Sequence, residues 1–166
     1  MRRKSDLGTD LIKGALAGLV ATWALERVTT YLYEHEDPGA RQREDAVRRG
    51  KAPFMVAAEK TSELIGLRIT EQQQQRLGMA YHWGLGLGAG ALYAALRPRL
   101  GALERGQGLG FGLLFFLFVD EALNTALGLT PPPQAYPWQA HARGLAGHLA
   151  YAVVADTALD VLDRAA

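Results

Sequence analysis

Acidic, histidine and amide side chains interrupt otherwise apolar stretches of this sequence, and they are the residues best suited to chemistry. They are Glu26, His82, Asp120, Glu121, Asn124, His148 and Asp156. An ionisable group in an apolar environment is costly unless it is paired, so each of these needs a partner or a function. Carboxylates beside histidines can hold and release protons, because imidazole changes its charge near neutral pH.

Three interpretations of this buried polar cluster are open. The side chains could satisfy one another and fix the register of neighbouring helices. They could form a protonatable cluster that handles protons or small ions. In the third interpretation His82 and His148 are metal ligands, either axial ligands of haem b or partners of Glu26 and Asp120 around a divalent metal, in a subunit of a larger redox assembly.

Other classes of function lack their signatures. The sequence contains no helical zinc-hydrolase motif, nucleophile elbow, phosphate loop or dinucleotide fingerprint, so we expect no enzyme and no catalytic residue. The absence of cysteine excludes disulfides, iron–sulfur clusters and thiolate zinc sites. A net charge of +1 and the lack of nucleic-acid-binding motifs argue against a nucleic-acid partner.

Four apolar, glycine-rich stretches carry the polar cluster. Residues 14–33, 77–96, 108–129 and 144–163 each approach the roughly 20 residues that a helix needs to cross about 30 Å of hydrocarbon. The run FGLLFFLFV in the third stretch has no polar face for water. A mean hydropathy of -0.03 hides this pattern, because the charges gather between the stretches and at the ends. A soluble helical bundle is the alternative, since no stretch is free of charge.

We therefore predict an all-α fold, with residues 1–166 forming a single integral membrane domain built as a four-helix transmembrane bundle in the lipid bilayer. Basic residues precede the first stretch and follow the second, whereas the loop 130–142 contains no lysine or arginine. By the positive-inside rule, both termini are cytoplasmic and the proline-rich loop is outside the bacterial inner membrane. The basic residues used are Arg2, Arg3, Lys4, Arg97, Arg99 and Arg105.

Counting from the cytoplasmic end of each helix places most of the cluster at one depth. At 1.5 Å per residue, Glu26, His82, Asp120, Glu121 and His148 lie about 18–22 Å in, whereas Asp156 lies about 10 Å in. Residues four apart share a helix face, so Asp120 and Asn124 should stack together. Glu121 points about 100° away from Asp120, so only one of the two should face a shared centre. Arg27 or His82 would then partner the other.

The extramembrane segment 34–76 holds equal numbers of basic and acidic residues and is partly helical. Pro53 suits the first turn of a helix, and Phe54, Ala58, Thr61 and Ile65 share one face of it up to about residue 66. This helix either lies along the outer membrane surface or is an ordinary solvated cap. Glu71 and the glutamines that follow it extend the second span outwards.

Glycines recur at four-residue spacing, which lets helix backbones approach closely. We expect these faces to pack within the monomer, with a homo-oligomer or a membrane protein partner as the alternative; a purely structural or assembly role would use the same faces. The pairs are Gly14/Gly18, Gly84/Gly88, Gly86/Gly90, Gly106/Gly110 and Gly108/Gly112.

One part of the sequence resembles a known family. The motif GLTPP at 128–132, PW at 137–138 and GH at 147–148 followed by Tyr151 is similar to the signature of the YagU-like bacterial inner-membrane proteins, most clearly over residues 108–163. The resemblance implies a polytopic inner-membrane protein associated with acid tolerance, with no established catalytic residue. It implies family-typical roles for Pro131, Pro132, Trp138 and His148. The sequence departs from the pattern at 142–144, where an acidic residue is expected.

The proline-rich loop also has a physical interpretation of its own. Three consecutive prolines stop a helix and fix an extended connector, with Tyr136 and Trp138 at the level of the lipid headgroups. Alternatively, the loop is a lid over the polar cluster, formed by Pro131, Pro132 and Trp138 with His141 at its mouth.

Overall fold

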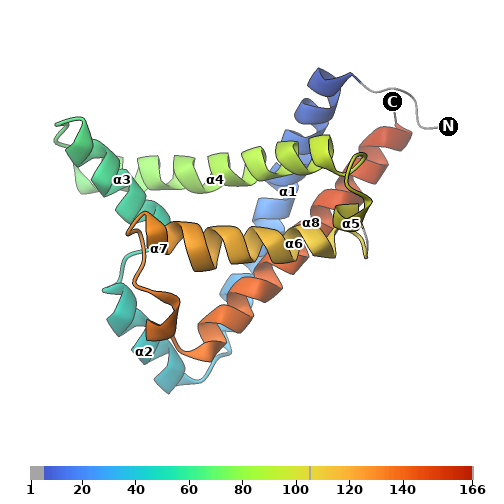
Figure 1. The fold of residues 1–166 in the computed structure, drawn as a ribbon. Coiled ribbons are helices and arrows are strands. Elements are labelled where there is room, and N and C mark those ends of the chain that lie inside the picture. Colours follow the sequence, from blue (N-terminus) through green and yellow to red (C-terminus); the bar gives the residue numbers. More distant parts are fainter. Residues whose placement is uncertain (1–5, 105, 166) are drawn as a thin grey trace.

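The protein is described by a computed structural model that covers residues 6–104 and 106–165. Within these residues the fold is entirely helical (Figure 1). Residues 2–4 and Arg105, which contribute to the topology prediction, lie outside the described residues. The helices, in order, are α1 (Leu7–Glu34), α2 (Pro38–Arg48), α3 (Pro53–Leu64), α4 (Glu71–Leu96), α5 (Gly101–Glu104), α6 (Leu109–Phe115), the π-helix η1 (Phe116–Leu123), α7 (Asn124–Ala126), the 3-10 helix η2 (Pro133–Ala135) and α8 (Trp138–Arg164).

Helices therefore occupy all four predicted apolar stretches, with α6, η1 and α7 forming one continuous rod. In Figure 1, α4 and the rod run in roughly the same direction and cross the pair formed by α1 and α8; α4 packs on α1, and the rod packs on α8. The start of α1 and the end of α8 meet at one end of the molecule, where Lys13 Nζ lies 3.0 Å from Asp163 Oδ1. The proline-rich loop and α2 lie at the opposite end (Figure 1).

Glycine permits the closest helix contact, between α1 and α4. A Cβ atom added at Gly14 would lie 2.5 Å from the carbonyl oxygen of Gly90, and one added at Gly90 would lie 2.6 Å from the Cα of Gly18. Both helices therefore pack backbone against backbone, as the four-residue spacing of Gly14/Gly18 and Gly86/Gly90 predicts. The neighbouring pair Gly84 and Gly88 has no atom within 4 Å of an added Cβ and faces outwards.

The distribution of side-chain sizes is the reverse of that in a water-soluble bundle. The buried apolar core consists largely of alanines, and the largest fully buried side chains are Tyr93, Tyr151, Leu159 and Glu44. Large apolar side chains cover the outside instead, including Ile12 at 66 % and Phe118 at 64 % exposure. Monomeric soluble proteins rarely expose such extended apolar surfaces.

Two helical rods are long and apolar enough to cross a membrane, namely Leu109–Ala126 and Trp138–Arg164. Only 22 % and 39 % of these apolar windows are buried inside the protein, whereas the core helix of a soluble protein is mostly buried. Length and hydropathy thus support two of the four predicted membrane spans. The described parts of α1 and α4 are not apolar enough to meet the same criterion.

The segment between α1 and α4 contains two helices, of which α3 was expected and α2 was not. Asp37 caps α2 by accepting a hydrogen bond from the backbone N–H of Ala40 at 2.8 Å, and Pro38 occupies the first turn. α3 packs along the start of α4 through a fully buried Ala58. The prediction that Ile65 shares this packed face is wrong, because α3 ends at Leu64 and Ile65 is 66 % exposed.

Candidate functional site

A cavity of about 880 Å³ lies between α1, α2, α4, η1 and α8. Its size is within the range of small-molecule binding sites, roughly 300–1,000 Å³. Apolar side chains such as Leu25, Leu85, Phe115 and Val119 form much of its wall. Its polar lining consists mainly of Tyr33, Arg41, Glu44, Asp45, Arg48, His82, Asp120, Glu121, Asn124, Tyr136, His141, Arg143 and His148.

The first carboxylate–histidine pair joins α1 to α4. Glu26 Oε1 lies 3.0 Å from His82 Nε2. Since a carboxylate only accepts, the proton of a neutral His82 belongs on Nε2, which leaves Nδ1 as the nitrogen able to take up another. The His82 ring also stacks against Phe54 of α3, with ring centroids 5.2 Å apart, and this contact orients the imidazole at the cavity wall.

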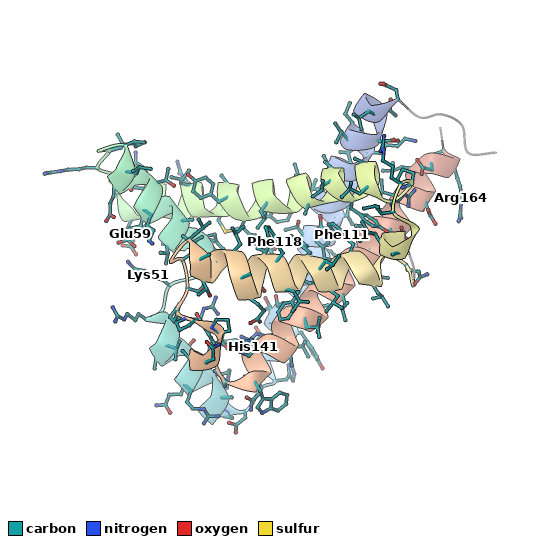
Figure 2. All side chains as sticks on the ribbon, viewed as in Figure 1. Lys51, Glu59, Phe111, Phe118, His141 and Arg164 are labelled. Atoms are coloured by element: carbon teal, nitrogen blue, oxygen red, sulfur yellow. The ribbon has the colours of Figure 1, made fainter. Side chains whose placement is uncertain are left out.

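The second pair joins η1 to the start of α8. His141 Nδ1 lies 2.6 Å from Glu121 Oε1, and His141 Nε2 lies 3.0 Å from the carbonyl oxygen of Pro133. A carbonyl oxygen cannot donate, so Nε2 carries a proton, and the contact with Glu121 requires a second proton between the two groups. Figure 2 shows His141 where the proline-rich loop meets α8. Through these two contacts His141 ties the proline-rich loop to η1 and α8.

The third pair is the loosest. Asp120 Oδ2 lies 3.7 Å from His148 Nδ1, which is beyond hydrogen-bond distance. His148 Nδ1 instead bonds the carbonyl oxygen of Gly144 at 2.9 Å and therefore carries the proton of the neutral ring. His148 is buried, and its ring packs edge-on against Phe115 at 4.7 Å between centroids. Its Nε2 is the nitrogen left to accept a further proton.

A π-helical segment brings both acids of η1 to the same cavity. Asn124 donates its backbone N–H to the carbonyl of Val119, five residues earlier, where an α-helix would use the residue four before. Asp120, Glu121 and Asn124 all line the cavity. Within the cavity the two acids face different neighbours, Asp120 towards His148 and Glu121 towards His141 at the start of α8, so one of them faces a neighbouring helix as predicted. Glu121 also pairs with His141, where the sequence suggested Arg27 or His82.

Asp156 does not belong to this cavity. It accepts a hydrogen bond from the Tyr93 hydroxyl at 2.7 Å and lies 3.1 Å from an Arg97 nitrogen, near the end of the molecule that contains both helix termini. Two further turns of α8 separate Asp156 from His148, about 12 Å along the helix. Arg97 also contacts Asp160 at 3.1 Å and Asp163. Burial lowers the pKa of Arg97, but the hydrogen bond to Asp156 and the negative charges of the three aspartates raise it by more. The net pKa is raised, so the guanidinium stays charged.

Sequence reasoning missed a buried ion cluster that holds α2 in place. Arg143 of α8 donates to Glu36 and to Glu44, and Glu44, which is almost fully buried, also accepts from Arg48 at 2.7 Å. Glu44 is the only acid of α2 on its buried face, a pattern visible in the sequence only once α2 is recognised. Because this cluster covers one end of the cavity, the segment 34–76 is part of the site.

The proline-rich loop contributes some of the predicted lid residues and not others. Pro131 and His141 line the cavity, whereas Pro132 is exposed and Trp138, at 73 % exposure, points away from it. Tyr136 is half-buried in the cavity wall, and its position at the level of the lipid headgroups stays a prediction. Burial raises the pKa of its hydroxyl. Only one of the two aromatic residues therefore faces outwards.

No group of three or more acidic or histidine side chains is arranged to hold a metal ion in residues 6–104 and 106–165. His82 and His148, the candidate ligands, each face one carboxylate from a different helix. Comparisons with protein-family models, with curated proteins and with solved structures find no match for this chain. The geometry of the cavity is therefore the basis for a functional assignment.

Proposed function

We propose that the protein is a small multi-pass protein of the bacterial cytoplasmic membrane whose cavity takes up protons when the surroundings become acidic. In this proposal all four long helices cross the bilayer, both termini are cytoplasmic, and the proline-rich loop with α2 and α3 lies outside. The carboxylate–histidine pairs of the cavity are the proton acceptors.

The membrane part of the proposal is supported by the arrangement of apolar side chains. The large ones lie on the outside of α1 and of the rod formed by α6 and η1, where lipid would cover them. Small residues occupy the helix contacts, which is how helices pack when lipid removes the hydrophobic driving force between them. Lys13 and Arg97 lie at one end, and a loop without lysine or arginine lies at the other, in agreement with cytoplasmic termini.

The observation that carries the proton part is the state of the histidine nitrogens. His82 and His148 each have one ring nitrogen bound to an oxygen acceptor and one without such a bond among the described residues. A carboxylate lies beside each ring, so the positive charge that a second proton brings is stabilised inside the protein. Imidazole is the side chain that changes charge over the physiological pH range. Two protons would thus enter the cavity on acidification.

The resemblance of residues 108–163 to the YagU-like proteins leads to a proposed physiological role in acid tolerance. GLTPP follows α7, PW stands at the start of α8 and GH lies in the first half of α8. Of these segments, Leu129, Thr130, Pro131 and His148 line the cavity. A motif spread over one cavity wall agrees with a shared role for that cavity.

Nitrogen-15 NMR of the histidine rings tests the proton part directly, because the chain has four histidines that single His→Gln variants can assign. Between about pH 8 and about pH 5, His82 and His148 should each change from one protonated nitrogen to two. His35, which is exposed, is the internal reference. Rings of His82 and His148 that stay neutral over this range would exclude proton uptake and leave the pairs a purely structural role.

The absence of cysteine makes the topology directly testable. A single cysteine at Gln134, in the proline-rich loop, should react with a membrane-impermeant maleimide added to intact cells. A cysteine at Leu100, between α4 and α5, should react only after the cells are opened. Reaction of both sites in intact cells, or recovery of the protein in the soluble fraction, contradicts the membrane proposal.

A further inference from the structure

Among the described residues, Asp120 is the one acid of the cavity lining that is at least half-buried and has no hydrogen bond; Glu34, which also has none, is exposed. Glu26, Glu121 and Glu44 each lie within hydrogen-bond distance of a histidine or an arginine, whereas no side-chain or backbone group of the described residues donates to Asp120. Its side chain nevertheless lines the cavity and is 37 % exposed. A carboxylate that faces a cavity without a hydrogen bond, and whose neighbour His148 carries no charge until it takes up a proton, is a favourable site for a cation.

We propose that Asp120 binds a monovalent organic cation with an apolar body, such as a hydrophobic ammonium or phosphonium ion. The inference rests on the proposed function, because it assigns a ligand to the same cavity. The cation would place its charge beside Asp120 and its apolar groups against the wall formed by Leu85, Phe115 and Val119.

The surroundings of Asp120 suit such a ligand. Phe116 precedes it by one turn of η1, and a Cβ atom on Gly144 of α8 would lie 3.0 Å from the Phe116 ring and 3.2 Å from Asp120 Oδ2. Glycine at this position therefore lets the backbone of α8 approach the carboxylate and the aromatic ring closely, which holds the two side chains next to each other. The Phe116 and His148 rings lie 5.8 Å apart. Aromatic faces next to a carboxylate attract cations that water solvates weakly.

The basic groups around Asp120 are paired with other acids and do not neutralise its charge. Arg48 of α2 and His141 of α8 contribute to its electrostatic environment, but Arg48 is bound to Glu44 at 2.7 Å and His141 to Glu121 at 2.6 Å. On α4, His82 is matched by Glu26 of α1. Only His148 lies close to Asp120 without a carboxylate of its own.

A proton on His148 Nε2 and an organic cation would therefore be alternative counter-ions of Asp120. When His148 is neutral, the carboxylate is available to the organic cation. When acidification charges His148, the imidazolium neutralises Asp120, and the two positive charges repel each other in the same space. Cation binding and proton uptake then exclude one another.

An anionic ligand fits the lining less well. Arg143 is bound to Glu36 and Glu44, and Lys51 to Glu59 at 2.6 Å; Figure 2 labels both residues of the last pair. Arg41 lies over the Tyr33 ring at 5.7 Å. The basic groups of the cavity are thus engaged by acids or by an aromatic ring, and Asp120 is the group that a ligand would complete.

Equilibrium dialysis of the detergent-purified full chain against tetraphenylphosphonium tests the proposal, with tetraphenylborate as a probe of the same shape and opposite charge. The phosphonium should bind with one site per chain at about pH 8, and Asp120→Asn should weaken binding by about 30-fold, the effect of neutralising one partner of a buried charge pair. Asp160→Asn makes the same chemical change on α8 outside the cavity and should bind as the unmodified protein does.

The coupling to protons adds a second readout. Lowering the pH from about 8 to about 5 should weaken phosphonium binding, and His148→Gln should retain binding but lose most of this pH dependence. Equal binding of the phosphonium by Asp120→Asn and the unmodified protein overturns the proposal, as does Asp120-dependent binding of tetraphenylborate. If the histidine NMR shows proton uptake but no phosphonium binds, this inference fails while the proposed function stands.

Discussion

Replacing Gly90 by alanine tests whether the α1–α4 contact is as close as the structure shows. The added Cβ would lie 2.3 Å from the carbonyl oxygen of Gly14, 2.6 Å from the Cα of Gly18 and 2.7 Å from its nitrogen. All three atoms belong to the backbone of α1, so no side chain can rotate away. The two helices must separate, and the contacts around them must loosen.

The net effect on stability is the difference between two opposing contributions. Overpacking a well-packed site costs about 1–3 kcal/mol, and three backbone contacts below 3 Å place Gly90→Ala near the upper end. Alanine regains about 1 kcal/mol over glycine within a helix. The free energy of unfolding should therefore fall by about 2 kcal/mol, which corresponds to a melting temperature roughly 4–8 °C lower for a chain of this length.

Gly88→Ala is the matched control, because it makes the same change half a turn away on α4. No atom lies within 4 Å of a Cβ at this position, so the variant should gain the helix contribution of about 1 kcal/mol and melt a few degrees higher. Thermal unfolding in detergent, followed by circular dichroism, measures both variants. Equal shifts for the two would refute the packing argument, and a loss of stability for Gly88→Ala would show that the outward glycine face is covered by another chain.

Three other substitutions test separate parts of the structure. Arg97→Gln should destabilise the protein by about 3 kcal/mol because it leaves Asp156 buried without its charge partner, whereas the exposed Arg99→Gln should change the free energy of unfolding by less than about 0.5 kcal/mol. Tyr151→Phe removes the buried 2.6 Å hydrogen bond to the Gly86 carbonyl and should cost about 1–2 kcal/mol in the same assay. Burial raises the pKa of the Tyr136 hydroxyl in the folded state, so on raising the pH the unfolded chain loses the hydroxyl proton first. The free energy of unfolding should therefore fall as the pH rises above about 10. Tyr136→Phe should reduce that fall, as measured by denaturant titrations at high pH.

Hydropathy located the long helices well but not their ends. The predicted stretch 14–33 lies inside α1, which begins at Leu7, because Asp10 and Lys13 continue the helix beyond the apolar run. An apolar run indicates which residues avoid water, whereas a helix ends where its backbone hydrogen bonds end. α2 has little apolar periodicity, and Asp37 followed by Pro38 was its only clear start signal.

The depth argument placed Glu26, His82, Asp120, Glu121 and His148 in one band without assigning pairs, and the structure shows which of these side chains meet. Equal rise per residue is sufficient to bring Glu26 level with His82 and Asp120 level with His148, since the helices involved are long and pack against one another. It could not find the partner of Glu121, because His141 lies in the first turn of α8, before the predicted fourth span. Whether these pairs exchange protons in the living cell stays a prediction.

The charge cluster around Glu44 shows a different limit of sequence reasoning. Arg143 and Glu44 are 99 positions apart, and many combinations of the basic and acidic residues in the segment 34–76 satisfy the same composition. Pairing between distant charges depends on how the helices carrying them are docked, which composition does not specify. The burial of Glu44 therefore had no signal in the sequence beyond its place on one face of an unrecognised helix.

The glycine contact and the polar cavity are two consequences of one gradient in side-chain size along α1 and α4. Near the start of α1, Gly14 meets Gly90; two turns further Thr22 fills the space left by Gly86, and one turn beyond that Glu26 reaches His82. The side chains between α1 and α4 thus become larger with distance from the closest contact of the two helices. A Cβ at residue 90 should therefore act beyond its own site by changing the separation at which Glu26 and His82 meet. We expect Gly90→Ala, unlike Gly88→Ala, to shift the His82 signals in the nitrogen-15 spectrum, and unchanged signals would show that the cavity is built independently of the glycine crossing.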